Sequence, residues 1–414
     1  MKILVVHNFH RKGSASGDDQ VFKSETALLE KHGNTVVRYS VENDRFDAAG
    51  ILGKIRYTLG MLWSFRYYRE LKSEIKRAKP DLVHIHTFFP LLSPSVLYAA
   101  KRCGVPVVAT LHDTRFICPC ATSLREGRLC NECIDGHYLR MWRYGCFKGS
   151  RIQSLFVALV FTYHRLRRSF FRKIDRYICL NEEQIALLKE SGYDPEKISK
   201  KYNFVSDPLR EGQFQNSGET MSVPSNGDSS SLQEQSRDLP ERFVVFYGRI
   251  GEEKGIRQLM QIFSRLPEIP LVVMGTGPMD RELNAWVSEH DNVSYLGYVP
   301  REKCLQIVKK SEFVVFPSIW YEGCSMVEIE AESLGKCLIA TDLGFSKELI
   351  RDDENGYKVP LGDTEGFAER IRMLFAEPET SKLLGDNARR DYEKRFTPEE
   401  NYKELMEIYG KLVK

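Results

Sequence analysis

Two glutamates separated by seven residues stand in the stretch "YEGCSMVEIEAESLGKCLIATD", which runs from Tyr321 to Asp342. Glu322 lies beside a glycine in a predicted loop, where its carboxylate is free to accept hydrogen bonds from hydroxyl groups. Glu330 lies inside a predicted helix that begins near Ser325. It stands about 60° around the helix from Val327 and so borders the buried face. A carboxylate there needs a partner, and the pair favours hydroxyl binding on either side of a helix end.

The predicted helix end also offers free backbone donors. Helix N-termini attract anions and hydroxyl oxygens, and the N–H groups concerned are those of Gly323, Cys324 and Ser325. The alternative is that the glutamates are only favourable charges near a helix N-terminus. That alternative explains Glu328 and Glu332 well, as solvated helix charges, but explains Glu322 and Glu330 less well.

A second candidate site follows the strand in "FYGRIGEEKG", which places Arg249 and Lys254 five residues apart around a glycine-containing turn. Two cations at the end of a strand suit a diphosphate, because arginine offers a planar fork and lysine a compact charge. The alternative is that both are exposed and balance Glu252 and Glu253.

Glycines follow two further predicted strands. Gly275 and Gly277 in "VVMGTGP" are a weak signal, because such turns use glycine for packing as often as for ligands. Gly17 follows the first strand of the chain and could bring backbone close to a ligand. A nicotinamide-dependent oxidoreductase would carry Gly-x-Gly-x-x-Gly at this place. Gly13 and Gly17 have the wrong spacing, which counts against that class.

The elements that position these residues alternate between strand and helix along the whole chain. Short apolar runs predict strands, among them "KILVVHN", "PDLVHIHT" and "GVPVVATLHD" in the first half and "RFVVFYG", "SEFVVFPS" and "KCLIATD" in the second. Helical stretches separate them, which is the rhythm of a parallel sheet covered by helices. The predicted fold class is α/β, with two doubly wound Rossmann-like domains that face each other across a cleft and bind ligands beyond the strand ends.

Length and composition agree with two domains. The chain has 414 residues, 42% of them hydrophobic and 28% charged, which describes a soluble globular protein of about two cores. We expect an N-terminal domain at 1–213, a flexible linker or insertion at 214–240, where Ser, Gly, Asn and Gln dominate, and a C-terminal domain at 241–395. The last helix, 396–414, could pack back on either domain.

The charge and the apolar runs limit the partners and the compartment. A net charge of +3 is too small to imply nucleic-acid binding. The N-terminus lacks the features of a signal peptide, and no apolar stretch reaches the roughly 20 residues that cross a bilayer. We therefore expect a cytoplasmic protein, in which thiols are reduced or bound to metal.

The cysteines include a group with metal-ligand spacing. Cys130 and Cys133 form a Cys-x2-Cys pair, and the flanking Cys118 and Cys146 could complete four thiolates for a structural zinc ion. The alternative is a set of reduced core or loop thiols.

Two segments combine positive charge with aromatic residues. Residues 54–79 hold eight Lys or Arg against two Glu, and residues 151–176 hold seven against one Asp. Such faces suit helices that lie on an anionic membrane, which would fit a lipid-linked substrate. The alternative is ordinary domain surface with a buried aromatic side.

Several of these motifs occur together in one known family. "GRIGEEKG", "GTGP", "LGYVPREKC", the stretch around "EGCSMVEIE" and "ENGYKV" resemble, in this order, the C-terminal domain of retaining glycosyltransferases of family 4. "EGCSMVEIE" is similar to the Glu-x7-Glu motif of that family. The N-terminal "GDDQVFKSETALLEKHGNTV", "PDLVHIHTFFPLLSPSVLYAAKRCGVPVVATLHD" and "FICP" resemble members that build bacterial surface polysaccharides. The resemblance covers most of the chain outside 214–239.

The resemblance implies a GT-B fold and a nucleotide-sugar donor held mainly by the C-terminal domain. It implies that Arg249 and Lys254 neutralise the donor diphosphate, that Glu330 holds ribose hydroxyls and that Glu322 holds hydroxyls of the transferred sugar. It adds His112, which follows "PVVATLHD" and would face the sugar from the N-terminal domain. Further donor contacts would come from the base-binding loop and the backbone N–H groups of the helix end, at Tyr298, Val299, Gly323, Cys324 and Ser325.

The implied activity is a retaining transfer without a catalytic metal, to a lipid-linked or oligosaccharide acceptor in cell-envelope polysaccharide or O-antigen assembly. The enzyme would be peripheral on the inner face of the cytoplasmic membrane. Two other classes stay open: a nucleotide-sugar epimerase or hydrolase of the same fold, and a non-catalytic protein that binds sugar nucleotides.

Overall fold

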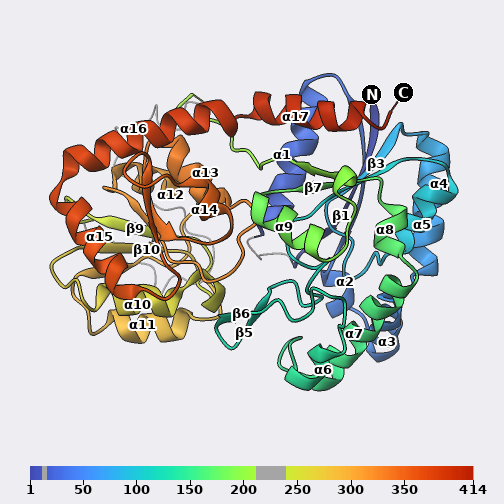
Figure 1. Ribbon diagram of the computed structural model, residues 1–414, viewed down its shortest axis with the longest axis horizontal. Helices are drawn as coiled ribbons and strands as arrows, with labels where there is room; N and C mark the ends of the chain where they lie inside the picture. The colour runs from blue at the N-terminus through green and yellow to red at the C-terminus, as the bar shows by residue number, and fades with distance from the viewer. Residues whose placement is uncertain (12–15, 211–238, 414) are drawn as a thin grey trace. The chain divides into compact units, whose positions relative to one another are not determined.

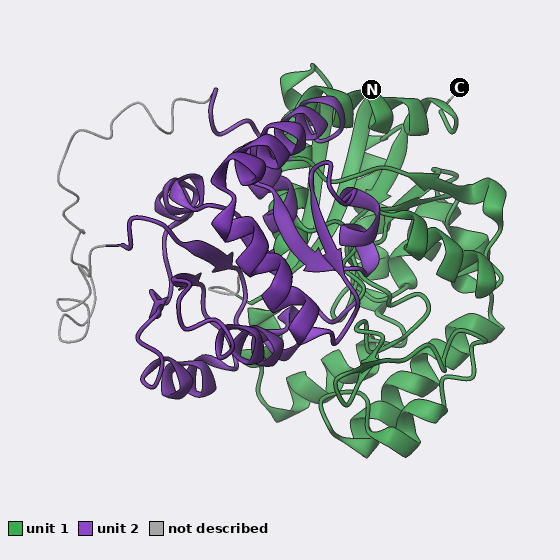
Figure 2. Cartoon of the chain, turned by 60° about the vertical axis from the view of Figure 1, so that its left-hand side comes forward, with its two compact units in different colours: residues 1–204, 321–325, 398–414 green, residues 205–320, 326–397 purple. Residues whose placement is uncertain are grey.

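The structure is a computed structural model that describes residues 1–11, 16–210 and 239–413 (Figure 1). The chain forms two compact units (Figure 2). Unit 1 contains residues 1–204, 321–325 and 398–414, and unit 2 contains residues 205–320 and 326–397. The predicted linker at 214–240 lies outside the described residues, apart from Leu239 and Pro240.

Unit 1 contains a six-stranded parallel sheet of order β2-β1-β3-β4-β7-β8. The register pairs Ile3 of β1 with Leu82 of β3. The central strands are apolar on both faces, as a sheet covered on both sides requires. The strands are β1 (Lys2–Phe9), β2 (Thr35–Glu42), β3 (Leu82–Ile85), β4 (Val107–Thr110), β7 (Arg176–Cys179) and β8 (Ile198–Lys200), with a separate hairpin of β5 (Leu124–Arg125) and β6 (Arg128–Leu129).

Helices cover both faces of this sheet. Ile3, Val5 and Leu82 pack with residues of α1 and α17, whereas Leu4 and Val6 face the core shared with α4, α5 and α7. The last described helix of the chain therefore completes the core of its first sheet. The helices of unit 1 are α1 (Gly17–Lys31), α2 (Asp44–Asp47), α3 (Ile51–Gly60), α4 (Phe65–Ala78), α5 (Ser95–Arg102), α6 (Arg140–Tyr144), α7 (Arg151–Leu166), α8 (Ser169–Lys173), α9 (Glu182–Glu190), η1 (Pro195–Lys197) and α17 (Pro398–Gly410).

Unit 2 contains a second six-stranded parallel sheet, of order β11-β10-β9-β12-β13-β14. Its main core lies between this sheet and α10, α11 and α15. The strands are β9 (Val244–Tyr247), β10 (Leu271–Met274), β11 (Val293–Tyr295), β12 (Val314–Phe316), β13 (Leu338–Thr341) and β14 (Gly356–Val359). The helices are η2 (Glu252–Lys254), α10 (Ile256–Phe263), α11 (Asp280–Val287), α12 (Arg301–Lys310), α13 (Met326–Ser333), α14 (Gly344–Leu349), α15 (Thr364–Ala376) and α16 (Pro378–Arg395).

The predicted fold class is confirmed: both sheets are parallel, doubly wound and interleaved with helices. In each sheet the strand order reverses at one place, between β1 and β3 in unit 1 and between β9 and β12 in unit 2. Ligands of such sheets bind beyond the carboxyl ends of the strands at these reversal points. The residues that follow β1, β3, β9 and β12 are therefore the first places to look for a site.

Candidate functional site

Arg249 and Lys254 follow β9, at the reversal point of unit 2. The Arg249 side chain is exposed, and its Nε lies 3.6 Å from Oε1 of Glu253. The Lys254 ammonium lies 5.6 Å from the ring centre of Phe316, the last residue of β12, and 5.4 Å from that of Trp320, in the segment that follows β12. These distances are within the range of cation–π attraction. Lys254 is thus held at the ends of the two strands that flank the reversal point.

The turn that carries Lys254 is fastened to the segment after β12. The backbone N–H of Ile319 donates to the carbonyl of Glu253 at 3.0 Å. Gly255 has a φ of +74°, and a Cβ at this position would lie 1.8 Å from the carbonyl oxygen of Pro317. Only glycine allows this approach. The local backbone therefore fixes the position of the Lys254 Cα. A preorganised anion site requires such a fixed position.

Gly275 and Gly277 lie where the turn after β10 packs against the turn after β9. A Cβ on Gly275 would lie 1.7 Å from the carbonyl oxygen of Gly248, and one on Gly277 would lie 2.2 Å from that of Ile250. Gly275 also has a φ of +132°. The contact between the two turns explains both glycines by packing alone, and their predicted role in donor binding stays a prediction.

Glu330 is buried in α13, with a residue exposure of 6%, and forms an ion pair with Arg301, the first residue of α12. Burial raises the pKa of the Glu330 carboxyl, and the Arg301 guanidinium opposes that rise. The sequence predicts that this carboxylate needs a partner, but no spacing rule pointed to Arg301, which comes from another helix. Tyr298, in the loop before α12, is 75% exposed, and Val299 is half-buried.

Glu328 and Glu332 are not solvated helix charges, so that explanation is wrong. Both have a residue exposure of 0%, and every residue of α13 from Glu328 to Ser333 is buried. Asn355 donates to Oε1 of Glu332 at 3.3 Å. Burial, and then the charge of Asp391, raise the pKa of the Glu332 carboxyl well above its ordinary value of 4.5. Glu332 therefore holds its proton to a higher pH than an exposed glutamate does.

Residues 321–325 belong to unit 1, where two asparagines hold their backbone. Asn181 donates to the carbonyls of Glu322 and Gly323, at 2.8 and 2.6 Å. Asn203 donates to the carbonyl of Cys324 at 2.9 Å. Glu322 is buried, with an exposure of 5%. The helix that the sequence places near Ser325 begins at Met326 as α13.

His112 follows β4 in unit 1 and is half-buried. Its Nε2 lies 3.0 Å from Nδ1 of His86, and the two rings stack with centres 5.2 Å apart. Burial lowers the pKa of His112 to about 4, so its ring is neutral at neutral pH. A Cβ on Gly323 would come within 3.3 Å of the His112 carbonyl oxygen, so this predicted sugar-facing residue and the 321–325 segment are neighbours in unit 1.

Gly17 is exposed and is the first residue of α1. It is followed by Asp18 and Asp19, which place negative charge at this helix N-terminus. Asp19 Oδ1 lies 2.7 Å from Nε2 of His7, and contacts with His10 and His7 lower the pKa of Asp19 although burial opposes this. These carboxylates disfavour a phosphate at the end of α1.

The cysteines predicted to bind zinc are all free thiols. The sulfur atoms of Cys118 and Cys120 lie 3.1 Å apart, and burial raises the pKa of Cys133 to about 12. In the described part of the chain, three metal-ligand atoms come within 4.8 Å of one another only in two groups, Glu25 with His84 and His86, and His10 with Asp18 and Asp19. Cys118, Cys130, Cys133 and Cys146 are thus not assembled as a four-thiolate site, and zinc stays a prediction.

The two basic aromatic segments, 54–79 and 151–176, and the first turn of α3 just before the first of them expose apolar side chains in unit 1. Ile51, Leu52 and Leu59 of α3 are 81%, 83% and 62% exposed, and Ile152 and Leu166 of α7 are 83% and 79% exposed. Nε2 of His164 in α7 lies 2.9 Å from the carbonyl oxygen of Leu62, just after α3, which joins the two elements. Within the described residues, no helix is long and apolar enough to span a membrane.

The buried group formed by Glu25, His84 and His86 was not predicted from the sequence. His84 and His86 belong to "PDLVHIHT", which predicts a strand, and Glu25 belongs to a predicted helix. Two histidines at alternate positions of an apolar strand were the available signal, because polar side chains in a buried strand need partners.

Two family models match the sequence, one in each half. Residues 26–207 match the model described as Glycosyltransferase Family 4, and residues 229–391 match Glycosyl transferases group 1. Among curated relatives, spore coat protein SA of Bacillus subtilis is 28% identical over 185 residues, 41% of this chain and 49% of the relative. O-antigen chain mannosyltransferase C of Escherichia coli is 25% identical over 190 residues, 45% of this chain and 51% of the relative. The matches span about half the length of these relatives.

A solved structure extends the likeness to the whole fold. The crystal structure of HepE from Anabaena in complex with UDP matches with a TM-score of 0.66 at 16% identity, and covers 100% of both chains. The same protein is also known in complex with UDP-glucose. At this identity the likeness shows the fold, which is the GT-B arrangement of two parallel-sheet domains. Residues 26–207 are thus similar to proteins of Glycosyltransferase Family 4, and residues 229–391 are similar to Glycosyl transferases group 1.

Proposed function

We propose that the protein is a retaining glycosyltransferase that moves a sugar from a nucleotide-sugar donor to a lipid-linked or oligosaccharide acceptor in cell-envelope polysaccharide assembly. The observation that carries the proposal is the pair of cations after β9, with Lys254 held over the Phe316 and Trp320 rings at the reversal point of unit 2. The two family matches and the UDP-bound structural neighbour support a nucleotide-sugar donor.

In this proposal the cations act on the leaving group. Negative charge develops on the nucleoside diphosphate as the bond to the sugar breaks, and Arg249 and Lys254 stabilise it electrostatically. Backbone N–H groups of Gly323, Cys324 and Ser325 add hydrogen bonds to the sugar and phosphate oxygens. Because fixed cations supply the charge, the transfer needs no catalytic metal, and an oxygen of the donor phosphate can take the acceptor proton.

The carboxylates bind hydroxyl groups. Glu330 accepts from the ribose hydroxyls, and its ion pair with Arg301 supports this role because the guanidinium opposes the rise in the carboxyl pKa that burial causes. Glu322 accepts from hydroxyls of the transferred sugar, while Tyr298 and Val299 contact the base. His112 meets the sugar from the N-terminal region.

The proposal includes binding of the protein to a membrane that carries the lipid-linked acceptor. The exposed apolar side chains of α3 and α7 lie among basic residues such as Lys54 and Arg56, a combination that binds the interface of an anionic bilayer. A lipid-linked acceptor would be presented there. A structural zinc ion on Cys118, Cys130, Cys133 and Cys146 is a separate proposal, and metal analysis of the purified protein that finds no zinc contradicts it.

Product analysis distinguishes this function from its alternatives. The protein is incubated with a panel of nucleotide sugars, first alone to measure thermal stabilisation and then with lipid-linked acceptors. A transferase lengthens the acceptor, and a retaining one keeps the anomeric configuration of the donor, as NMR of the product reports. An altered donor without acceptor indicates an epimerase, free sugar indicates a hydrolase, and donor binding without any product indicates a sugar-nucleotide-binding protein.

A further inference from the structure

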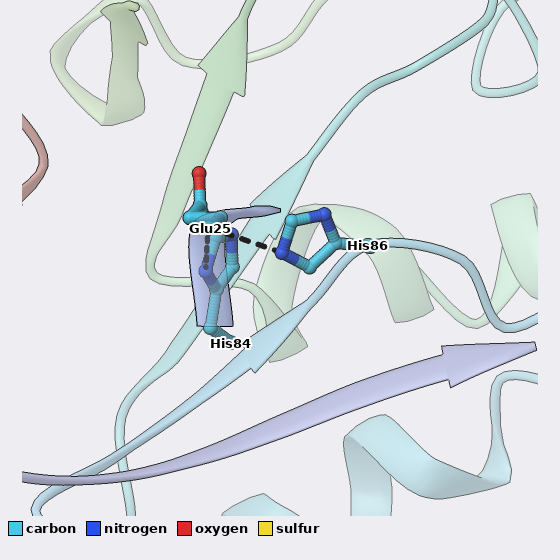
Figure 3. A group of neighbouring side chains, drawn as sticks. All are labelled: Glu25, His84 and His86. Carbon is cyan, nitrogen blue, oxygen red and sulfur yellow. Dashed lines mark ion pairs between the residues drawn. The ribbon is translucent and has the colours of Figure 1, made fainter. Parts of the chain in front are cut away.

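Glu25 of α1 meets two histidines of the β3 segment inside unit 1 (Figure 3). Its Oε1 lies 3.2 Å from Nδ1 of His84 and 3.1 Å from Nε2 of His86. All three residues are buried, with exposures of 1%, 0% and 5%. Figure 3 shows both imidazole rings directed at the one carboxylate. A shared carboxylate oxygen between two imidazoles fits either a metal ion or an ordered set of protons.

The charge balance favours ordered protons. The second carboxylate oxygen, Oε2, lies 2.9 Å from the ammonium of Lys201, which is itself 1% exposed. Burial alone would raise the pKa of the Glu25 carboxyl, but Lys201 and the two imidazoles hold it well below its usual value. Glu25 and Lys201 therefore neutralise each other. A divalent cation on two neutral imidazoles would add two uncompensated charges in a buried place, which is costly.

An ionised carboxylate fixes the proton of His86. Its Oε1 lies 3.1 Å from Nε2 of His86 without the alignment of a hydrogen bond, but the negative oxygen repels a nitrogen lone pair and attracts an N–H, so the hydrogen is favoured on Nε2. In a neutral imidazole the other nitrogen, Nδ1, is then an acceptor. Burial lowers the pKa of His86 well below its usual value, so the ring is neutral at neutral pH.

The same logic passes from His86 to His112. Nδ1 of His86 lies 3.0 Å from Nε2 of His112. Since the first atom is an acceptor, the second must be the donor, which leaves Nδ1 of His112 without a hydrogen. Of the described residues, only His86 makes a hydrogen bond with the His112 ring.

His84 does not disturb this order. Its Nδ1 also lies 2.7 Å from the hydroxyl of Tyr409, and its Nε2 lies 2.8 Å from that of Thr110. The charge of Oε1 of Glu25 also favours a hydrogen on Nδ1 of His84, and the hydroxyl of Thr110 then donates to Nε2 of His84. The direction of the proton chain is therefore set by Glu25 alone.

We propose that Glu25 is a positioning residue that acts through His86 to hold His112 in the tautomer protonated at Nε2, so that its Nδ1 accepts a hydrogen bond from a saccharide hydroxyl. The last step rests on the proposed function. The proton order does not, because it follows from groups within unit 1.

The experiment reverses the order of the protons on His86 and His112. In Glu25→Gln, the ammonium of Lys201 attracts the amide oxygen, so the amide N–H groups face His86 Nε2. Nε2 of His86 must then accept a hydrogen bond, so the hydrogen of His86 moves to its Nδ1. Because Nδ1 of His86 is now a donor, Nε2 of His112 must accept, and His112 carries its hydrogen on Nδ1. We expect two-bond ¹⁵N–¹H spectra of ¹⁵N-histidine protein to show His86 and His112 protonated at Nε2 in the natural protein and at Nδ1 in the variant. Single replacements of His86 and His112 assign the signals.

A matched control and a second variant keep the test decisive. Glu30→Gln lies on the same helix, where Glu30 is exposed and binds Arg38, and should change neither tautomer. If Glu25→Gln does not fold because Lys201 loses its partner, Glu25→Gln with Lys201→Gln restores neutrality and keeps a donor on the amide oxygen. A folded variant in which His112 stays protonated at Nε2 overturns the proposal. If the spectra show the expected tautomers but the protein has no transferase activity, the proton order from Glu25 to His112 stands. Only the contact of His112 with a saccharide is then refuted.

Discussion

At the scale of single residues, the test of the proposed donor site is Lys254. Its ammonium is held over Phe316 and Trp320, so Lys254→Met keeps most of the apolar contact and removes the charge. A hydrogen bond to a charged group contributes about 1.5–3 kcal/mol, so we expect nucleoside-diphosphate affinity to fall by roughly 10- to 100-fold. Calorimetric titration of the diphosphate measures it.

The control for this change is Lys310→Met, at the end of α12, where the lysine is exposed. Lys310→Met removes the same charge, but at a place away from the ends of β9 and β12. Its affinity for the nucleoside diphosphate should match that of the unaltered protein. Equal affinity in Lys254→Met and Lys310→Met would contradict the diphosphate role.

A second residue-scale prediction concerns Glu332. Its pKa is raised in the folded protein by burial, and then by Asp391, so the folded state binds this proton more tightly than the unfolded state. The free energy of unfolding therefore falls as the pH rises above 4.5 towards the folded pKa. Glu332→Gln keeps a polar side chain of the same size and removes this titration. We expect urea unfolding at pH 5 and pH 9 to show a smaller loss of stability in the variant.

The comparison for Glu332 is Glu369→Gln, on the exposed side of α15. That variant should retain the pH dependence of the natural protein. If Glu332→Gln behaves in the same way as Glu369→Gln, the Glu332 carboxyl does not have the raised pKa that the structure indicates.

How far the sequence predicts these residues depends on where their partners come from. The candidate site at Arg249 and Lys254 can be predicted from the sequence, because the end of the strand and both cations lie within ten consecutive residues. The burial of Glu332 is not visible, because Asn355 and Asp391, which surround it, follow 23 and 59 positions later. The helix pattern alone assigns such a glutamate to solvent, and only tertiary packing reverses that assignment.

At the scale of elements, the apolar runs predict the central strands because parallel sheets bury both faces. β14 was not predicted as a strand: it is the four-residue run "GYKV", which begins with glycine and includes a half-buried lysine. The hairpin of β5 and β6 has two residues in each strand, too few for any period. Strand prediction thus succeeded for continuous apolar runs and failed for strands that are too short or too mixed in sequence to show such a run.

The element-scale prediction is that α3 binds an anionic membrane. Leu52 and Ile55 are 83% and 51% exposed on a helix that has no buried residue. Burying each such side chain in the bilayer interface contributes about 1.5–3 kcal/mol. Leu52→Ser with Ile55→Ser should therefore weaken binding to vesicles that contain anionic lipid by at least about tenfold, as co-sedimentation at low salt measures.

Leu383→Ser is the matched control for this surface, because Leu383 is also exposed, at 59%, but lies on α16 of unit 2. It should bind vesicles as the natural protein does. Failure of the natural protein itself to bind at low salt would remove the membrane from the proposal and leave the donor chemistry untouched.

At the scale of the whole molecule, the last helix of the chain is part of the first sheet's core. Leu405, Ile408 and Tyr409 of α17 are buried against Ile3, Val5 and Leu82. Each large apolar group lost from a core costs about 2–5 kcal/mol. Ending the chain at Thr397 should therefore destabilise unit 1, while unit 2, which contains none of these contacts, keeps its own core.

Hydrogen exchange read by mass spectrometry separates the two units in this test. In the truncated chain, peptides from β1, β3 and β4 should exchange much faster, whereas peptides from β9 to β13 should exchange at the rate of the full chain. A chain that ends at Gly410 keeps α17 and serves as the control. Equal protection of β1 in the two shortened chains would contradict the assignment of α17 to unit 1. Faster exchange spread evenly over both sheets would instead mean that the two units unfold as one, and the donor-binding variants would then have to be compared only at matched stability.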